Sequence, residues 1–150
     1  KFAEVAHVKF PFWTATEQEK DSKELITNLT IGEAVAQKIV KNETLAYFMT
    51  RTYMFLVACG IKTEAIRFRQ HKGKEMAHYA NDCWDAEVEC SYEWVEVAGH
   101  ADRSAFDLEK HQAASKCEMV AARPLAQPID VTSTICTLDK KIVGKEFKKE

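Results

Sequence analysis

Glycine and proline are scarce in this chain, with 5 and 3 residues among 150. This scarcity excludes collagen-like and low-complexity segments. No apolar run approaches the roughly 20 residues that a membrane-spanning helix requires, so we expect no membrane contact. Neither sign of charge dominates, with 21 Lys and Arg against 23 Asp and Glu. This balance argues against a dedicated nucleic-acid-binding module, which carries a strongly basic face.

The hydrophobic fraction of 46% is high enough for one domain with a real core. The chain starts at Lys1 and finishes in a charged stretch, which favours a piece of a longer protein. Its five cysteines include no Cys-x-x-Cys pair, and five is an odd number. We therefore expect buried, reduced thiols in a cytosolic protein and no disulfide framework.

Helix signals stand in three places. Residues 30–33, Thr-Ile-Gly-Glu, predict a capping box and a short helix to about residue 40. Asn42 predicts the cap of a helix over 43–59 that is buried on more than one side and ends at Gly60. A second capping box at 104–107 predicts a helix to about residue 116. Upstream, 10–13 is an apolar cluster expected to dock on the core, and 14–23 is expected to be a loop.

Strand signals follow the long helix. Apolar and polar residues alternate over 66–71, 83–89 and 94–98, and the short link 90–93 predicts an antiparallel hairpin. Residues 72–81 predict a turn and a short helix, and 131–138 predicts a further strand. Because strands follow one another without a helix between each pair, we expect an α+β fold, a mostly antiparallel sheet flanked by helices.

One face of this predicted sheet is charged. Six charged side chains alternate with the apolar ones in these strands, namely Arg67, Arg69, Asp85, Glu87, Glu89 and Glu96. A solvated outer face with weak cross-strand ion pairs is one interpretation. The other is a binding floor, since guanidinium groups suit polyphosphate and carboxylates suit Mg²⁺. A zinc site at His71, Glu75 and His78 matches no strong signature, and glycine-rich phosphate loops and a nucleophile elbow are absent.

Four ordered blocks resemble the catalytic core of the homodimeric glycyl-tRNA synthetases, which are class II aminoacyl-tRNA synthetases. The blocks are Arg-Phe-Arg-Gln-His at 67–71, Glu-Met-Ala-His-Tyr-Ala at 75–80, Asp-Cys-Trp-Asp-Ala-Glu at 82–87 and Trp-Val-Glu-Val-Ala-Gly-His-Ala-Asp-Arg-Ser at 94–104. The likeness is dense over 64–112 and looser over 31–62. It assigns 1–123 to the class II catalytic core, with 1–30 weakly patterned, and 124–150 to the start of an insertion.

The resemblance implies ATP-dependent activation of glycine and transfer to the 3′ end of the glycine tRNA. Glu96 and Val97 fall at the ATP site, with Glu96 near a Mg²⁺ ion, and Arg103 supplies a positive charge that is structural or close to the nucleotide. No catalytic residue is implied, because the glycine carboxylate attacks the α-phosphorus directly and catalysis rests on positioning and electrostatics. The implied partners are glycine, the glycine tRNA and a second copy of the longer protein, in the cytoplasm and also in mitochondria.

The family's motif 1, motif 2 and motif 3 find no match in these 150 residues, so the isolated piece is expected to be inactive. A non-catalytic paralogue, or a binding module that uses the same sheet for a protein or tRNA partner, is the alternative. A zinc-dependent or redox protein is a third hypothesis, which stoichiometric metal would reveal.

Overall fold

The computed structural model describes residues 1–122, 124–125 and 127–135. The chain divides into two units, Lys1–Met119 and Val120–Glu150. All helices and strands of the described residues lie in the first unit. The strand predicted over 131–138 is wrong for 131–135, which form no regular structure, and 136–138 lie outside the described residues.

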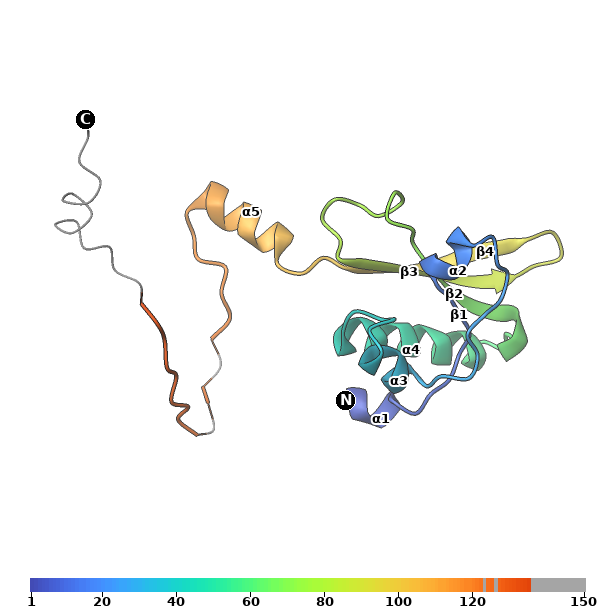
Figure 1. Cartoon of the computed structure of the whole chain (residues 1–150), viewed down its shortest axis with the longest axis horizontal. Coiled ribbons are helices and arrows are strands. Elements are labelled where there is room, and N and C mark those ends of the chain that lie inside the picture. The colour runs from blue at the N-terminus through green and yellow to red at the C-terminus, as the bar shows by residue number, and fades with distance from the viewer. Residues whose placement is uncertain (123, 126, 136–150) are drawn as a thin grey trace, which may run out of the picture. The chain divides into compact units, whose positions relative to one another are not determined.

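A four-stranded sheet organises the first unit (Figure 1). Its order is β1 (Phe12–Trp13), β2 (Ile66–Gln70), β3 (Asp82–Glu89) and β4 (Trp94–Asp102). The pairs β2–β3 and β3–β4 are antiparallel, whereas β1 runs parallel to β2. The α+β class is thus confirmed, and the sheet is mixed because a short segment near the N-terminus adds the fourth strand.

The link between β3 and β4 is the predicted hairpin, closed by a hydrogen bond from the Cys90 N–H to the Glu93 carbonyl. The link between β2 and β3 differs from its prediction, because it consists of turns and contains no helix. The Glu75 side chain accepts the Lys72 N–H at 3.0 Å and so satisfies a turn locally. This bond offers the backbone an alternative to a helix.

The first unit contains five α-helices: α1 (Phe2–Val5), α2 (Ala15–Glu19), α3 (Ile31–Ala36), α4 (Glu43–Ala58) and α5 (Phe106–Ser115). A short 3₁₀ turn, Thr63–Ala65, precedes β2. The capping box of α3 is confirmed, since Thr30 accepts the Glu33 N–H and Glu33 accepts the Thr30 N–H. The helix ends at Ala36, before the predicted residue 40. The predicted loop over 14–23 is wrong in part, because Thr14 caps α2.

The boundaries of α4 are confirmed. Asn42 accepts the Leu45 N–H at 2.9 Å, and Gly60 follows the helix with a φ of 89°, a conformation that suits glycine. The second capping box is wrong, because α5 has Ala105 as its N-cap and no side-chain cap bond. The Ser104 N–H instead donates to the Asp102 side chain at 2.9 Å, which draws Ser104 out of the capping position.

The core lies between the sheet and α3 and α4 (Figure 1). Its largest fully buried side chains include Trp84, Phe12, Phe68, Ile31, Met49 and Ile66. The docking of 10–13 is confirmed, since Phe10 and Phe12 are buried in this core. Among the described residues, no helix is both long enough and apolar enough to cross a membrane.

Two burial predictions fail. Only one face of α4 is buried in the described part of the chain, because Phe48, Met54, Phe55 and Val57 are exposed. The four described cysteines are free, as expected, but only Cys83 is buried, and Cys136 lies outside the described residues. Burial raises the pKa of the Cys83 thiol, with the nearby Asp82 carboxylate adding to the effect.

Candidate functional site

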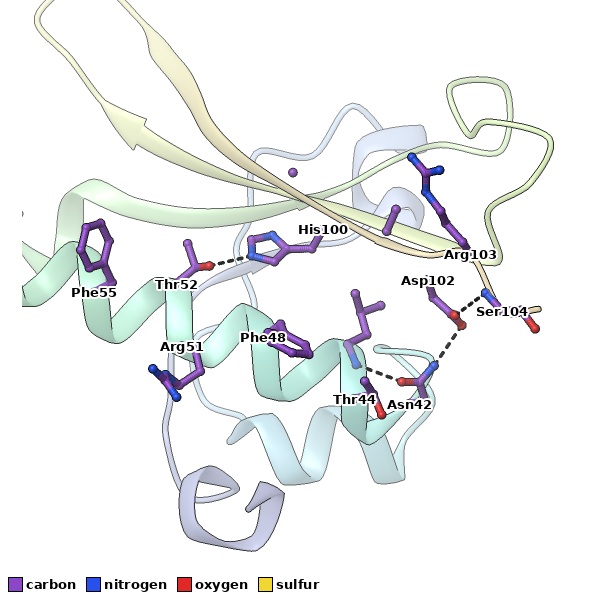
Figure 2. A pocket seen from close by; sticks show the side chains of 13 residues that line it. Asn42, Thr44, Phe48, Arg51, Thr52, Phe55, His100, Asp102, Arg103 and Ser104 are labelled. Atoms are coloured by element: carbon purple, nitrogen blue, oxygen red, sulfur yellow. Dashed lines mark hydrogen bonds between the residues drawn. The ribbon is translucent and has the colours of Figure 1, made fainter. Parts of the chain in front are cut away.

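A pocket of about 850 Å³ lies between α4 and the second half of β4 (Figure 2). His100 crosses its floor, with Nε2 2.8 Å from the Thr52 hydroxyl and Nδ1 3.3 Å from the Trp84 carbonyl. Burial lowers the pKa of His100 below its ordinary value of 6.5. A neutral imidazole fits these contacts, since Nδ1–H donates to the carbonyl and Nε2 accepts from the hydroxyl.

The opposite face of the sheet carries the predicted charges. We call this the polar face and define it by Arg67, Arg69, Asp85, Glu87, Glu89 and Glu96, of which Glu89 and Glu96 are exposed. Trp84 and Ala86 point into the core, so their alternating neighbours Asp85 and Glu87 belong to the other side.

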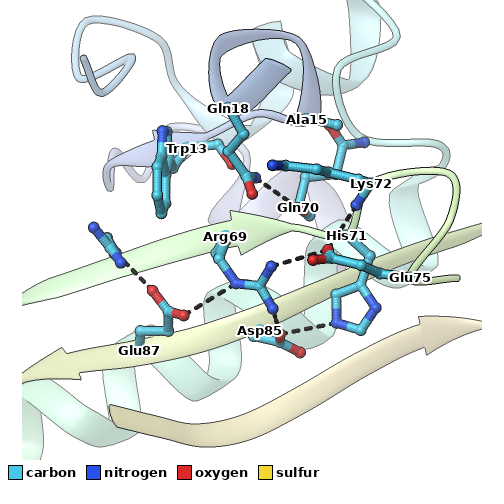
Figure 3. A network of polar contacts seen from close by, with 11 residues as sticks. Trp13, Ala15, Gln18, Arg69, Gln70, His71, Lys72, Glu75, Asp85 and Glu87 are labelled. Carbon is cyan, nitrogen blue, oxygen red and sulfur yellow. Dashed lines mark hydrogen bonds and ion pairs between the residues drawn. The ribbon is translucent and has the colours of Figure 1, made fainter. Parts of the chain in front are cut away.

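Ion pairs cross the polar face from strand to strand (Figure 3). Glu87 accepts from Arg67 Nε at 2.6 Å and from Arg69 Nε at 3.1 Å. The other two guanidinium nitrogens of Arg69 donate to Asp85 at 2.8 Å and to Glu75 at 3.0 Å. Burial alone would lower the pKa of Arg69, but the bonds to Glu75 and the two other carboxylates raise it.

The pairs are not the solvated surface pairs of the first interpretation. Asp85 and Glu87 are only 4% and 7% exposed. Buried carboxylates persist when they are paired and hydrogen-bonded, and removing one partner is strongly destabilising. The guanidinium groups of Arg67 and Arg69 are engaged by these carboxylates, so the polar face as described does not offer them to a phosphate.

Arg67 is held from both sides as well. Its guanidinium carbon lies 4.3 Å from the ring centre of Trp13 in β1 and 4.1 Å from that of Trp94 in β4. Sequence patterns could not place Trp13 here, because its strand pairs with β2 across more than fifty intervening residues. The cation–π stack therefore ties β1, β2 and β4 together.

Glu96 differs from Asp85 and Glu87, the two buried acids of this face. It lies opposite Glu87, yet within the described residues it forms no ion pair. The register then passes from Glu87–Glu96 to Ala86–Ala98, which leaves Val97 as the extra residue of a β-bulge. Bulges re-aim side chains and occur beside active sites. The alternation predicted over 94–98 puts Val97 on the apolar side of the strand with Val95, but Val97 is 48% exposed.

A cavity of about 230 Å³ opens beside Glu96. A Cβ placed on Gly99 would lie 3.5 Å from a Glu96 carboxylate oxygen and 3.8 Å from one of Asp85, so the missing side chain leaves room between two carboxylates. His71 also lines the cavity, and its Nε2 lies 2.8 Å from the Asp85 carboxylate. The cavity is therefore acidic and suits a cation or a donor group.

Arg103 directly follows β4 and contacts other residues than Glu96 and Val97 do. Its guanidinium carbon stacks 4.4 Å from the ring centre of Tyr79, and it forms a half-exposed ion pair with Asp107 at 3.3 Å. Tyr79 in turn lines the cavity beside Glu96, whereas Arg103 itself lines the larger pocket. The structure thus places Glu96 and Val97 at one β-bulge. Arg103 does not line the cavity beside Glu96, but it stacks on Tyr79, which does.

The structure defines an α+β protein with a mixed four-stranded sheet. One face of that sheet carries acidic side chains, two of which are ion-paired with arginine. No protein-family model matches the chain. Individual proteins do: it is 47% identical over 150 residues to the mitochondrial glycine–tRNA ligase 1 of Saccharomyces cerevisiae. It is 49% identical over 150 residues to a glycine–tRNA ligase of Drosophila melanogaster. A protein of Arabidopsis thaliana named as a cytoplasmic glycine–tRNA ligase is 47% identical over 148 residues.

These alignments cover 99–100% of the chain but only 22%, 19% and 32% of the three relatives. The chain therefore spans about a fifth to a third of the length of the relatives it matches. Over its whole length it is similar to one segment of glycine–tRNA ligases, and the resemblance drawn from its sequence is confirmed.

Proposed function

We propose that this chain is a segment of a glycine–tRNA ligase, the enzyme class that activates glycine with ATP and transfers it to the 3′ end of the glycine tRNA. The similarity of all 150 residues of this chain to ligases with that name is the observation that carries this proposal. Residues 1–123 would form part of the class II catalytic core, and 124–150 would begin an insertion. By the same likeness the longer protein would be a homodimer in the cytoplasm, and also in mitochondria.

Within this segment we assign the nucleotide contacts to the β-bulge. Val97 is the residue without a register partner on β3, so its backbone groups are the ones that a nucleotide can reach. Glu96 contributes a carboxylate that forms no ion pair among the described residues. Arg103, which directly follows the same strand, supplies positive charge next to Tyr79.

Mg²⁺ would supply charge neutralisation on the phosphates of ATP. The described residues hold no cluster of three or more His, Cys, Asp and Glu side chains arranged for a metal. One free carboxylate still fits this ion, because Mg²⁺ is usually bound by one or two carboxylates together with substrate phosphates and water. Glu96 would orient the ion, and the ion pairs of Glu87 and Asp85 would keep the floor beneath it rigid.

A segment exchange tests the proposal. The chain replaces the matching 150 residues of the yeast mitochondrial relative, and glycine-dependent ATP–pyrophosphate exchange is measured. We expect activity in the exchanged ligase and none in the isolated 150 residues. Glu96→Gln should reduce the exchange rate. Glu89→Gln is the matched control and should leave the rate unchanged, since Glu89 is an exposed carboxylate of the polar face on the neighbouring strand β3.

Three results would contradict these assignments. Robust exchange by the isolated chain would show a complete site within it. A folded exchanged ligase without activity would favour the non-catalytic binding module. Unchanged kinetics in Glu96→Gln would remove Glu96 from the nucleotide site.

A further inference from the structure

Three charged residues lie in one row across three strands. Arg67 of β2 is the register partner of Glu87 of β3, and Glu87 is the register partner of Glu96 of β4. Two carboxylates in direct cross-strand register repel each other unless a cation neutralises one of them. In this row Glu87 takes the cation, and Glu96 remains without an ion pair among the described residues.

The two arginines depend on Glu87 to different degrees. Arg69 also binds Asp85 and Glu75, so it keeps two carboxylates if Glu87 is lost. For Arg67, Glu87 is the one ion-pair partner in the described part of the chain. Loss of the Glu87 charge would therefore release Arg67 and leave Arg69 held.

The released guanidinium would already be next to β4. It stacks on Trp94, which precedes Glu96 by two residues and projects from the same side of that strand. Trp13 closes the other side of the stack, so the guanidinium is restricted to the plane between two rings. A guanidinium beside a free carboxylate forms a strong charge-assisted pair.

We propose that Glu87 is a positioning residue: it holds Arg67 away from Glu96 and so keeps the Glu96 carboxylate free for a cation. This inference deepens the proposed function and rests on it for the identity of the cation, the Mg²⁺ ion of the nucleotide. Glu87 itself touches no reacting atom. Glu87 acts on the cation site only indirectly, by determining whether Arg67 pairs with Glu87 or with Glu96.

The first test uses the 150-residue chain without metal or nucleotide. Solvent exchange of the Arg67 Nε proton is measured by NMR in the wild type, in Glu87→Gln and in Glu87→Gln/Glu96→Gln. Glu87→Gln should stay within about threefold of the wild-type rate because Glu96 takes over the pair, and the double variant should exchange about tenfold faster. Equal rates in the single and double variants, whether both slow or both fast, would overturn the proposal.

The second test uses the exchanged ligase and the Mg²⁺ concentration that gives half-maximal pyrophosphate exchange. Glu87→Gln should raise this concentration about tenfold, and Arg67→Gln/Glu87→Gln should bring it back to within about threefold of the wild-type value. A merely structural Glu87 would make the double variant worse than the single one, which would overturn the proposal. If Glu96→Gln leaves the Mg²⁺ dependence unchanged, the proposed function fails, while the proton-exchange test still decides how Arg67 chooses its partner.

Discussion

Glu96 lies directly opposite Glu87 across the β3–β4 pair, and within the part of the chain that the structure describes only Glu87 of the two is neutralised by arginine. Because of this asymmetry, the two glutamates differ in what they can bind: Glu87 already binds two arginines, whereas the Glu96 carboxylate, unpaired among the described residues, is free for another cation. Glu87 is buried and fixes the sheet, whereas Glu96 is exposed at a β-bulge beside a small acidic cavity. The remaining predictions concern the framework that holds this pair in register.

Trp84→Ala should lower the free energy of unfolding by about 3–5 kcal/mol, because it removes the largest fully buried side chain of the core. The indole N–H also donates to Asp82 at 3.0 Å, and that bond would be lost. Urea denaturation followed by circular dichroism measures the change. Trp84→Phe, which keeps most of the apolar volume, should lose clearly less, and equal losses in the two variants would contradict a packing role.

Thr30→Ala should cost about 1 kcal/mol, the usual contribution of an N-cap side chain. The hydroxyl accepts the Glu33 N–H at 3.2 Å, and Glu33 accepts the Thr30 N–H at 2.7 Å. Exposed Thr27 provides the matched control, since Thr27→Ala should change the unfolding midpoint little. Similar shifts in both variants would show that the capping box contributes nothing measurable.

Gly32→Ala should destabilise the chain by about 1–3 kcal/mol through overpacking, despite the better helix propensity of alanine. Its Cβ would lie 2.9 Å from the Ala6 carbonyl oxygen, a backbone atom that cannot turn away. Gly73→Ala is the control, because no atom lies within 4 Å of a Cβ at that position. Thermal unfolding of the two variants compares them, and a stabilised Gly32→Ala would contradict the close approach of α1 and α3.

Stability should fall as the pH drops below about 6.5, because the unfolded chain then binds a proton that folded His100 takes up only at lower pH. The lowered pKa of His100 stems from its burial, and the contribution is fully present above the unfolded pKa. Urea midpoints measured from pH 7.5 to 5 test the direction. His100→Gln should flatten this part of the curve, and an identical slope in the variant would assign the pH dependence to other groups.

Local patterns predicted what depends on neighbours in sequence. The caps of α3 and α4, the stop at Gly60 and the alternation of apolar and charged side chains along β3 follow from hydrogen bonds and side-chain periods within a few residues. The same reasoning failed at 104–107, where Asp102 took the Ser104 N–H, and at 72–81, where Glu75 satisfied a turn. In the first place that bond displaced the cap, although the helix still forms from Phe106, and in the second it stabilised a turn where a helix was expected.

The sequence by itself determined α3, α4 and α5, the three antiparallel strands and the list of charged residues on one face, because capping signals and side-chain periods depend on near neighbours. Only the tertiary structure decided which of those charges are paired, which are buried and where the register slips. Arg67 receives Trp13 from a strand distant in sequence, and Val97 becomes the extra residue only once β4 is laid against β3. A pairing partner across a sheet is set by the packing of the whole core, which no local pattern contains.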